Sequence, residues 1–324
     1  MVKKFILIGA VVSLIFILGC KTGGDRSNIN LDYKAIHTGS EGITLDFLPN
    51  LPPEKVMEGN SYNMGLRLAN RGAYDVKEGE GFFTFRGDKS DIDIKNPYQA
   101  ISLKGKSLLN PKGEETINAD YAMDVLKIKE NDTKKKESFI FIDLCYKYKT
   151  EAIANICIDT DVYSLSYREK VCKIKDISLS SQGAPIAVTG IKQNMVPVGN
   201  AKEKLSPEFE VTIANVGKGT PFYKPAFTEA ICKGTLAKND FKDSWNSVEV
   251  MAEIEGSGLR FECNGDSQGT RPVRLDKQKT FICRTLGGID AKIPPYTSIL
   301  KINIDYAYIS TISKKIEIEK FDIR

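Results

Sequence analysis

The chain has very few of the residues on which most metal and acid–base chemistry depends. Its 324 residues include one histidine, His37, and one tryptophan, Trp245. A single histidine excludes a histidine-rich metal site. A Ser-His-Asp or Cys-His arrangement would need His37, which lies in an N-terminal extension, and the chain has no GxSxG motif. We therefore predict no catalytic residue, no metal and no cofactor, and we expect that the protein is not an enzyme.

Long helical periodicity and a strong excess of one charge are also missing. An α/β solute-binding protein would alternate strands with amphipathic helices, which this pattern does not show. The formal net charge is only +4, and lysines and acidic residues are interspersed along the chain. This distribution is typical of a solvated surface, so we expect no nucleic-acid partner.

The one long apolar run lies at the N-terminus. Lys3 and Lys4 precede a small and apolar stretch, residues 5–19, that ends at Cys20. A charged start, a short apolar centre and a small residue before the cysteine form a secretory signal. The run is shorter than the ~20 residues that a spanning helix needs. We therefore predict a signal peptide over residues 1–19 and an extracytoplasmic location for the rest.

The end of this signal, Ile17-Leu18-Gly19-Cys20, resembles the lipobox of prokaryotic lipoproteins. The resemblance implies cleavage before Cys20 and acylation of its sulfur. Residues 20–30 are polar and contain glycine, as expected of a lipidated tether. The predicted first partner is thus a membrane, bound through lipid on Cys20.

The remaining cysteines are even in number. Seven cysteines occur in all, and those other than Cys20 are Cys145, Cys157, Cys172, Cys232, Cys263 and Cys283. An even number in an oxidising compartment favours disulfides. A zinc site is the alternative, but the chain has no CxxC pair.

Two internal matches indicate a tandem duplication. Residues 66–72 (LRLANRG) match residues 211–217 (VTIANVG), and residues 140–158 align without gaps to residues 300–318. Both pairs show the period-two alternation of half-buried strands. The Asn-x-Gly ends of the first pair predict tight turns with positive φ. The second pair contains a polar centre, and we interpret each copy as a terminal β-hairpin with one apolar face.

Short apolar segments separated by Gly, Pro and Asn fill the rest of the chain. Many short strands with turn signals predict an all-β fold of two tandem immunoglobulin-like β-sandwich domains. A helical turn or two is expected near residues 120–127 and 228–233. The predicted domains are residues 31–165 and 184–324, joined by a linker over residues 166–183.

A strand that ends in Asn-x-Gly, after a Pro-containing loop and before further short strands, resembles CARDB-type and related immunoglobulin-like modules. The stretch Cys145-Tyr-x-Tyr-x-Thr followed by Cys157-Ile-Asp is also similar to archaeal surface proteins of this kind. The resemblance implies a sandwich fold and a surface lipoprotein of a prokaryote, in particular an archaeon. It carries over no catalytic residue.

Strand parity gives predictions for the disulfides. Cys145 and Cys157 have the opposite parity to their apolar neighbours, and their counterparts in the second copy are Asp305 and Glu317. We therefore predict an exposed Cys145–Cys157 bridge across the first terminal hairpin. Cys263 and Cys283 share the inward parity and are predicted to pair. Elimination then leaves Cys172 with Cys232, although four cysteines allow three connectivities.

Four further motifs are weighed as sites. Arg86-Gly87-Asp88 is interpreted as a hairpin turn rather than a recognition tripeptide. The spacing of Asp88, Asp91 and Asp93 fits no complete calcium loop. Asn131 begins a glycosylation sequon in a polar loop. Tyr146, Tyr148, Tyr306 and Tyr308 share the core parity and are expected to pack inside.

Two functions are compatible with this pattern. The first is a non-enzymatic, lipid-anchored cell-surface protein whose loops bind an envelope or extracellular protein partner or support an envelope assembly. The candidate loops are residues 86–98, 127–138, 198–206 and 236–246. The alternative is a lipoprotein that binds carbohydrate or a small ligand, or an accessory module of an envelope enzyme. An exposed Trp245 beside a groove would favour the alternative, and a buried Trp245 would weaken it.

Overall fold

The structure is a computed structural model that describes residues 33–129, 134–163, 170–199, 203–223, 225–264 and 272–320. The described chain is nearly all β, which confirms the predicted class. The predicted signal peptide, Cys20 and Asn131 lie outside the described residues. Within the described ranges no helix is long and apolar enough to cross a membrane.

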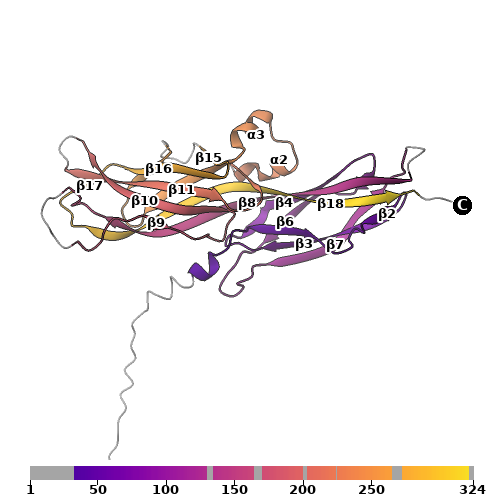
Figure 1. Cartoon of the computed structure of the whole chain (residues 1–324), viewed down its shortest axis with the longest axis horizontal. Coiled ribbons are helices and arrows are strands. Elements are labelled where there is room, and N and C mark those ends of the chain that lie inside the picture. The colour runs from indigo at the N-terminus through magenta and orange to yellow at the C-terminus, as the bar shows by residue number, and fades with distance from the viewer. Residues whose placement is uncertain are drawn as a thin grey trace, which may run out of the picture.

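Three sheets make up the fold (Figure 1). The first sheet has the order β1 (Ile43–Phe47), β3 (Ser61–Asn70), β7 (Glu115–Val125) and β5 (Ile92–Ile94). The second has the order β14 (Arg260–Cys263), β16 (Gln278–Leu286), β11 (Lys204–Asn215), β10 (Ile186–Val198) and β9 (Ile177–Ser178), and β17 (Ile289–Asp290) also pairs with β11.

The third sheet is the largest and extends along the whole molecule. Its order is β15 (Val273–Arg274), β13 (Ser247–Ile254), β18 (Tyr296–Glu319), β8 (Lys135–Ile158), β4 (Val76–Gly87) and β6 (Tyr98–Leu103), with β12 (Thr220–Phe222) and β2 (Lys55–Met57) also paired to β18. All pairings are antiparallel except that of β2 with β18. The short helices η1 (Pro225–Phe227), α2 (Thr228–Cys232) and α3 (Lys238–Ser244) lie between β12 and β13.

The two longest strands hold the halves of the chain together. β8 and β18 each contain 24 residues and pair with one another from Lys135–Glu319 to Ile158–Tyr296. At about 3.3 Å per residue the paired ribbon is about 80 Å long. The prediction of two terminal hairpins is therefore wrong, because each polar centre continues as a strand instead of turning. Of the two helical turns expected, the one near residues 228–233 is confirmed as α2, whereas residues 120–125 belong to β7.

The register of this ribbon matches the duplication. Tyr146 and Tyr148 correspond to Tyr306 and Tyr308 in the sequence alignment, and in the ribbon Tyr146 lies opposite Tyr308 and Tyr148 opposite Tyr306. Each tyrosine thus faces the counterpart of its neighbour, as an approximate twofold axis would arrange them. The two smaller sheets also match the duplication. Ile43 of β1 lies opposite Asn70 of β3, and in the second copy Ile186 of β10 lies opposite Asn215 of β11.

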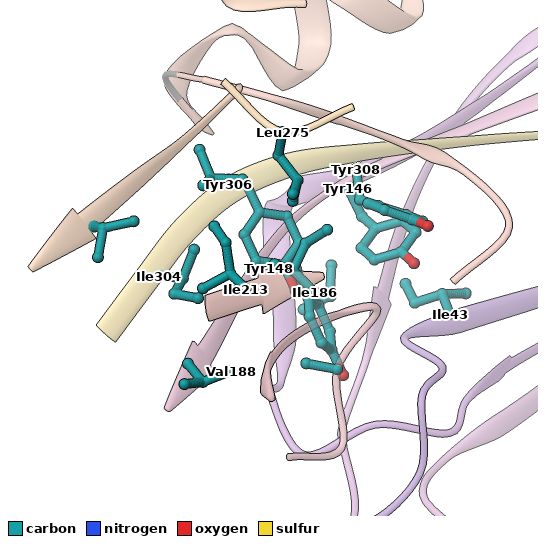
Figure 2. Packing of buried hydrophobic residues seen from close by; sticks show 14 of the residues in the cluster. Ile43, Tyr146, Tyr148, Ile186, Val188, Ile213, Leu275, Ile304, Tyr306 and Tyr308 are labelled. Atoms are coloured by element: carbon teal, nitrogen blue, oxygen red, sulfur yellow. The ribbon is translucent and has the colours of Figure 1, made fainter. Parts of the chain in front are cut away.

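The same four tyrosines lie at the centre of the core (Figure 2). All are buried, which confirms the packing expected from their parity. Ring centroids are 5.8 Å apart for Tyr146 and Tyr308 and 6.4 Å apart for Tyr148 and Tyr306. A single core cluster includes Leu66 and Val211, and therefore both copies of the repeat. A fragment of residues 30–324 retains every described strand, disulfide and core residue.

Each Asn-x-Gly motif binds one of these tyrosines. The Tyr148 hydroxyl donates to Oδ1 of Asn70 at 3.1 Å, and Asn70 Nδ2 donates to the carbonyl of Tyr74 at 2.8 Å. The second copy repeats these bonds: Tyr308 donates to Asn215 at 3.0 Å, and Asn215 donates to the carbonyl of Gly219 at 2.8 Å. The repeated bonds are a structural counterpart of the duplication seen in the sequence.

The glycines of these motifs are needed for space rather than for backbone conformation. Neither the asparagines nor Gly72 and Gly217 have a positive φ, so that part of the turn prediction is wrong. A Cβ on Gly72 would overlap the Tyr148 hydroxyl, and one on Gly217 would overlap the Tyr308 hydroxyl. Burial raises the pKa of both tyrosines, that of Tyr308 to about 12 despite hydrogen bonds from Gly219 and to Asn215.

All six cysteines outside the signal form disulfides, but two of the predicted pairings are wrong. The Cys263–Cys283 pair is confirmed, with Cα atoms 4.0 Å apart on β14 and β16. Cys145 instead bonds Cys232, and Cys157 bonds Cys172. Cys145 and Cys157 cannot meet because both lie on the straight strand β8, twelve residues and therefore about 40 Å apart.

Candidate functional site

A helical insertion distinguishes the second half of the chain from the first. In the first half, β4 runs beside β8 without interruption from Gly81 to Gly87. In the second half, β12 leaves β18 after Phe222, which faces Ala307, and β13 rejoins it at Glu249, which faces Asp305. Residues 223–248 are thus inserted where the first copy continues as a strand. In Figure 1, α2 and α3 stand away from the large sheet on one side.

A disulfide and aromatic contacts fasten this insertion to the other half of the chain. Cys232 of α2 is bonded to Cys145 of β8, with Cα atoms 5.6 Å apart. Both cysteines are buried with Phe82 of β4, and Tyr98 of β6 packs against them. Lys233 Nζ lies 4.5 Å from the centre of the Tyr98 ring. The predicted outward direction of Cys145 is correct, but the insertion covers that face, so the predicted exposure is wrong.

A groove lies where the insertion meets the sheet. It has a volume of about 490 Å³, and its lining consists of Gly79, Glu80, Lys147, Pro225, Ala226, Thr228, Glu229, Glu249 and Asp305. The lining therefore comes from both halves of the chain. Four of its side chains are acidic and one is basic. Lys147 Nζ forms an ion pair with Glu80 Oε1 at 3.2 Å.

Partial burial shifts the pKa values of two residues that line this groove. It raises the pKa of Asp305 above the usual range, and the positive charges of Lys149 and Lys147 oppose that shift. Burial lowers the pKa of Lys147, but its hydrogen bond to Glu80 and the charges of Tyr74, Glu80 and Asp305 together raise it. The groove thus has the chemistry to hold a cationic or hydrogen-bonding group beside a fixed Lys147–Glu80 pair.

Trp245 lies at the C-terminal end of α3. The prediction of a loop over residues 236–246 is therefore wrong for this part of the chain. The exposed fractions of Trp245 and Phe241 are 37% and 40%. The inner sides of both rings pack against buried Phe222, with centroids 5.1 Å and 5.2 Å away. Trp245 is outside the lining of the groove, so it is a half-exposed aromatic on the insertion rather than part of that cavity.

The remaining candidate sites have structural roles. Arg86 and Gly87 end β4, and Asp88 accepts hydrogen bonds from the backbone and side chain of Ser90, so a turn is present. The prediction of a hairpin turn is wrong, because β5 pairs with β7 in another sheet and not with β4. Asp91 is buried and paired with Lys136 at 2.5 Å. In the described ranges, no group of three or more His, Cys, Asp or Glu side chains could hold a metal ion. His37 is half-buried and stacks on Tyr33, with centroids 3.8 Å apart.

Sequence reasoning missed the groove because its acidic residues are scattered over four segments. The available signal was the change of offset between the two repeat matches, from 145 residues (66 to 211) to 160 residues (140 to 300). The second copy therefore contains extra residues between Gly217 and residue 300, the stretch that includes Cys232. An unmatched cysteine within an insertion indicates that the insertion is fastened to the rest of the fold.

Comparison with known proteins adds little to this description. No protein-family model matches the sequence, and the comparison with curated proteins found no match. Among solved structures, the CupB6 tip adhesin of Pseudomonas aeruginosa aligns over 87% of this chain and 98% of its own, with 10% identity and a TM-score of 0.17. A likeness at that score carries no argument about fold or function.

Proposed function

We propose that the protein is a lipid-anchored, non-enzymatic surface protein that presents the helical insertion to a partner in the envelope or outside the cell. The three disulfides are the observation that carries this proposal. Disulfides persist in oxidising compartments and are rare in the cytosol. They agree with the secretory signal and the lipobox-like end at Cys20, which supply the proposed anchor. A two-sandwich, immunoglobulin-like organisation of the halves is part of the same proposal.

The insertion is the favoured binding surface for a physical reason. Loops on rigid β scaffolds commonly carry binding function because the scaffold fixes their position. Here Cys145–Cys232 fixes α2 on the central ribbon, while α3 exposes Phe241 and Trp245 at its outer side. Exposed aromatics that keep a buried inner edge are typical contributors to binding energy at protein interfaces.

The lipid anchor is tested by Cys20→Ser. Without the sulfur no thioether to lipid can form, so we expect unprocessed precursor or release of the protein from membranes. Two acyl chains give stable anchoring where one is marginal. The measurement is fractionation of cells with detection of mature size, and Ser27→Ala in the tether is the control. Unchanged size and unchanged membrane retention in Cys20→Ser would show that the anchor is wrong.

Binding of a glycan is the second candidate, because Trp245 and Phe241 form an exposed aromatic pair with ring centroids 5.3 Å apart. A glycan array probed with residues 30–324 tests it. If glycans bind, Trp245→Ala should reduce the affinity about two- to twelvefold, because aromatic stacking contributes about 0.5–1.5 kcal/mol. Ile282→Ala, which changes an exposed residue on β16, should leave the signal unchanged. If the Trp245→Ala and Ile282→Ala variants give equal signals, Trp245 does not contribute to glycan binding.

A further inference from the structure

The most exposed large apolar side chain of the described residues, that of Leu109, lies with its neighbour Leu108 at the tip of one turn. Leu108 and Leu109 connect β6 to β7, and their exposed fractions are 59% and 99%. Ser107 and Asn110 exchange backbone hydrogen bonds of 3.0 Å and 3.1 Å across the turn. The turn therefore holds two adjacent leucines in solvent, where their apolar surface gains nothing from the fold.

The base of this turn is fastened to the rest of the molecule. The Lys106 amide donates to the carbonyl of Gly72 at 2.8 Å, and the Gly105 amide donates to Asp75 Oδ1 at 2.7 Å. The Glu114 amide donates to the carbonyl of Lys104 at 3.0 Å. The leucines are thus held outward by the same region that contains the Asn70–Gly72 motif, so little ordering would be required when they bind.

Basic residues surround the two leucines. Lys104 and Lys112 are exposed on the two arms of the turn, and Lys106 is half-buried between them. Two acidic residues lie on the returning arm: Glu115 is paired with Arg71, and Glu114 accepts a hydrogen bond from the Lys104 backbone amide at 2.7 Å. Counting that pair as neutral, the three lysines outnumber the one remaining carboxylate. An apolar tip with a basic collar has the chemistry of a segment that enters the boundary between acyl chains and anionic headgroups.

The N-terminal end of the described chain lies next to this turn. Lys106 Nζ donates to the carbonyl of Thr38 at 2.7 Å. Residues 33–36 form a short helix, and the Tyr33 hydroxyl donates to the carbonyl of Glu151 at 2.8 Å. Figure 1 shows this indigo helix near the middle of the long axis, on the side of the molecule opposite α2 and α3 and not at an end. Cys20 precedes Tyr33 by thirteen residues, a reach of at most about 45 Å.

We propose that the Leu108–Leu109 tip inserts into the outer leaflet of an anionic membrane and acts as a second contact beside the lipid anchor. The proposal builds on the anchor at Cys20, because the tether keeps this face close to the membrane and raises the effective concentration of the tip. The long axis of the molecule then lies along the membrane, and the insertion at residues 223–248 remains accessible.

The test uses fluorescence, since the chain has one tryptophan. Residues 30–324 carrying Trp245→Phe and Leu109→Trp are attached by an N-terminal polyhistidine tag to vesicles of phosphatidylcholine, phosphatidylglycerol and a nickel-chelating lipid. The tag replaces the acyl anchor, so failure here is distinct from failure of Cys20 lipidation. We expect a blue-shifted emission, and brominated acyl chains should quench it several-fold more strongly than a soluble quencher does.

The matched control is Trp245→Phe with Leu286→Trp, which places the reporter at an exposed leucine on β16. Its emission should not be quenched by brominated lipid. Equal quenching at both positions, or none at position 109, would overturn the proposal. A blue shift at position 109 that appears without vesicles and grows with protein concentration would also overturn it, because the tip would then bind a second copy of the chain.

Discussion

Replacing Cys145 and Cys232 together by alanine should lower the free energy of unfolding more than removal of either other disulfide. This bridge closes a separation of 87 residues, for which the chain-entropy model gives about 4.5 kcal/mol. Alanine is the appropriate substitute because both sites are buried and serine would bury an extra hydroxyl. The insertion should also lose protection from hydrogen exchange, since helices of five and seven residues are not stable by themselves.

The matched control replaces Cys157 and Cys172 by alanine. Their disulfide closes a separation of 15 residues, so its removal should lower the free energy of unfolding by about 3 kcal/mol. Denaturant unfolding of residues 30–324 measures both changes. Exchange at residues 228–244 should rise only in the Cys145/Cys232 variant. If protection of α2 and α3 stays unchanged in that variant, the bridge does not hold the insertion in place.

Gly72→Ala should destabilise the fold by about 3 kcal/mol or more, through overpacking and the loss of buried hydrogen bonds. The added methyl group would occupy the position of the Tyr148 hydroxyl. Tyr148 would have to move, and the buried Asn70 Oδ1 would lose one of its two donors, the other being the Gly72 amide. Gly217→Ala should have an effect of similar size through Tyr308 and Asn215, because the second copy repeats the arrangement.

Gly190→Ala is the matched control for both variants. Its Cβ would lie 3.8 Å from the nearest atom, and its φ is not in the left-handed region. We expect a change within about 1 kcal/mol there, mostly from backbone entropy. Thermal or denaturant unfolding separates the outcomes. A Gly72→Ala protein as stable as Gly190→Ala would contradict the proposed role of the Tyr148–Asn70 contact.

Much of the β structure could be predicted because burial imposes period two. The segments around Leu66 and Val211 were identified as strands from alternation, and the core parity of Tyr146 and Tyr306 was correct. Alternation of apolar and polar residues is visible within a single strand and does not depend on which strand lies beside it. Sequence therefore reveals which face of a strand is buried more readily than it reveals which strands are neighbours.

The hairpin prediction failed because polar residues were interpreted as a turn. The centre of β8 is Lys149-Thr150-Glu151, without glycine, proline or asparagine. Thr150 is buried and donates to the carbonyl of Ile186 at 2.6 Å, while Glu151 pairs with Lys301 at 3.2 Å. These polar groups are satisfied by the second half of the chain. A turn and a polar contact between halves look alike in a sequence, since only the partner distinguishes them.

The cysteine predictions failed for a related reason. The alternation of side chains along the strand correctly predicted which face of the sheet Cys145 is on. It gives no information on which other segment covers that face. The segment that covers it, residues 225–245, has no counterpart in the first copy, so the duplication could not reveal it either. The Cys263–Cys283 pair was predictable because both residues share an inward face on adjacent strands.

The central claim, a protein held at the outer face of a membrane by lipid on its first mature residue, is tested most directly by mass spectrometry. The measurement is the intact mass, with fragmentation of the N-terminal peptide, of protein extracted from native membranes with detergent. The account predicts a mature chain that begins at Cys20 and carries a diacylglyceryl group on its sulfur. A chain that retains residues 1–19, or one that begins at Cys20 with a free thiol, would contradict it.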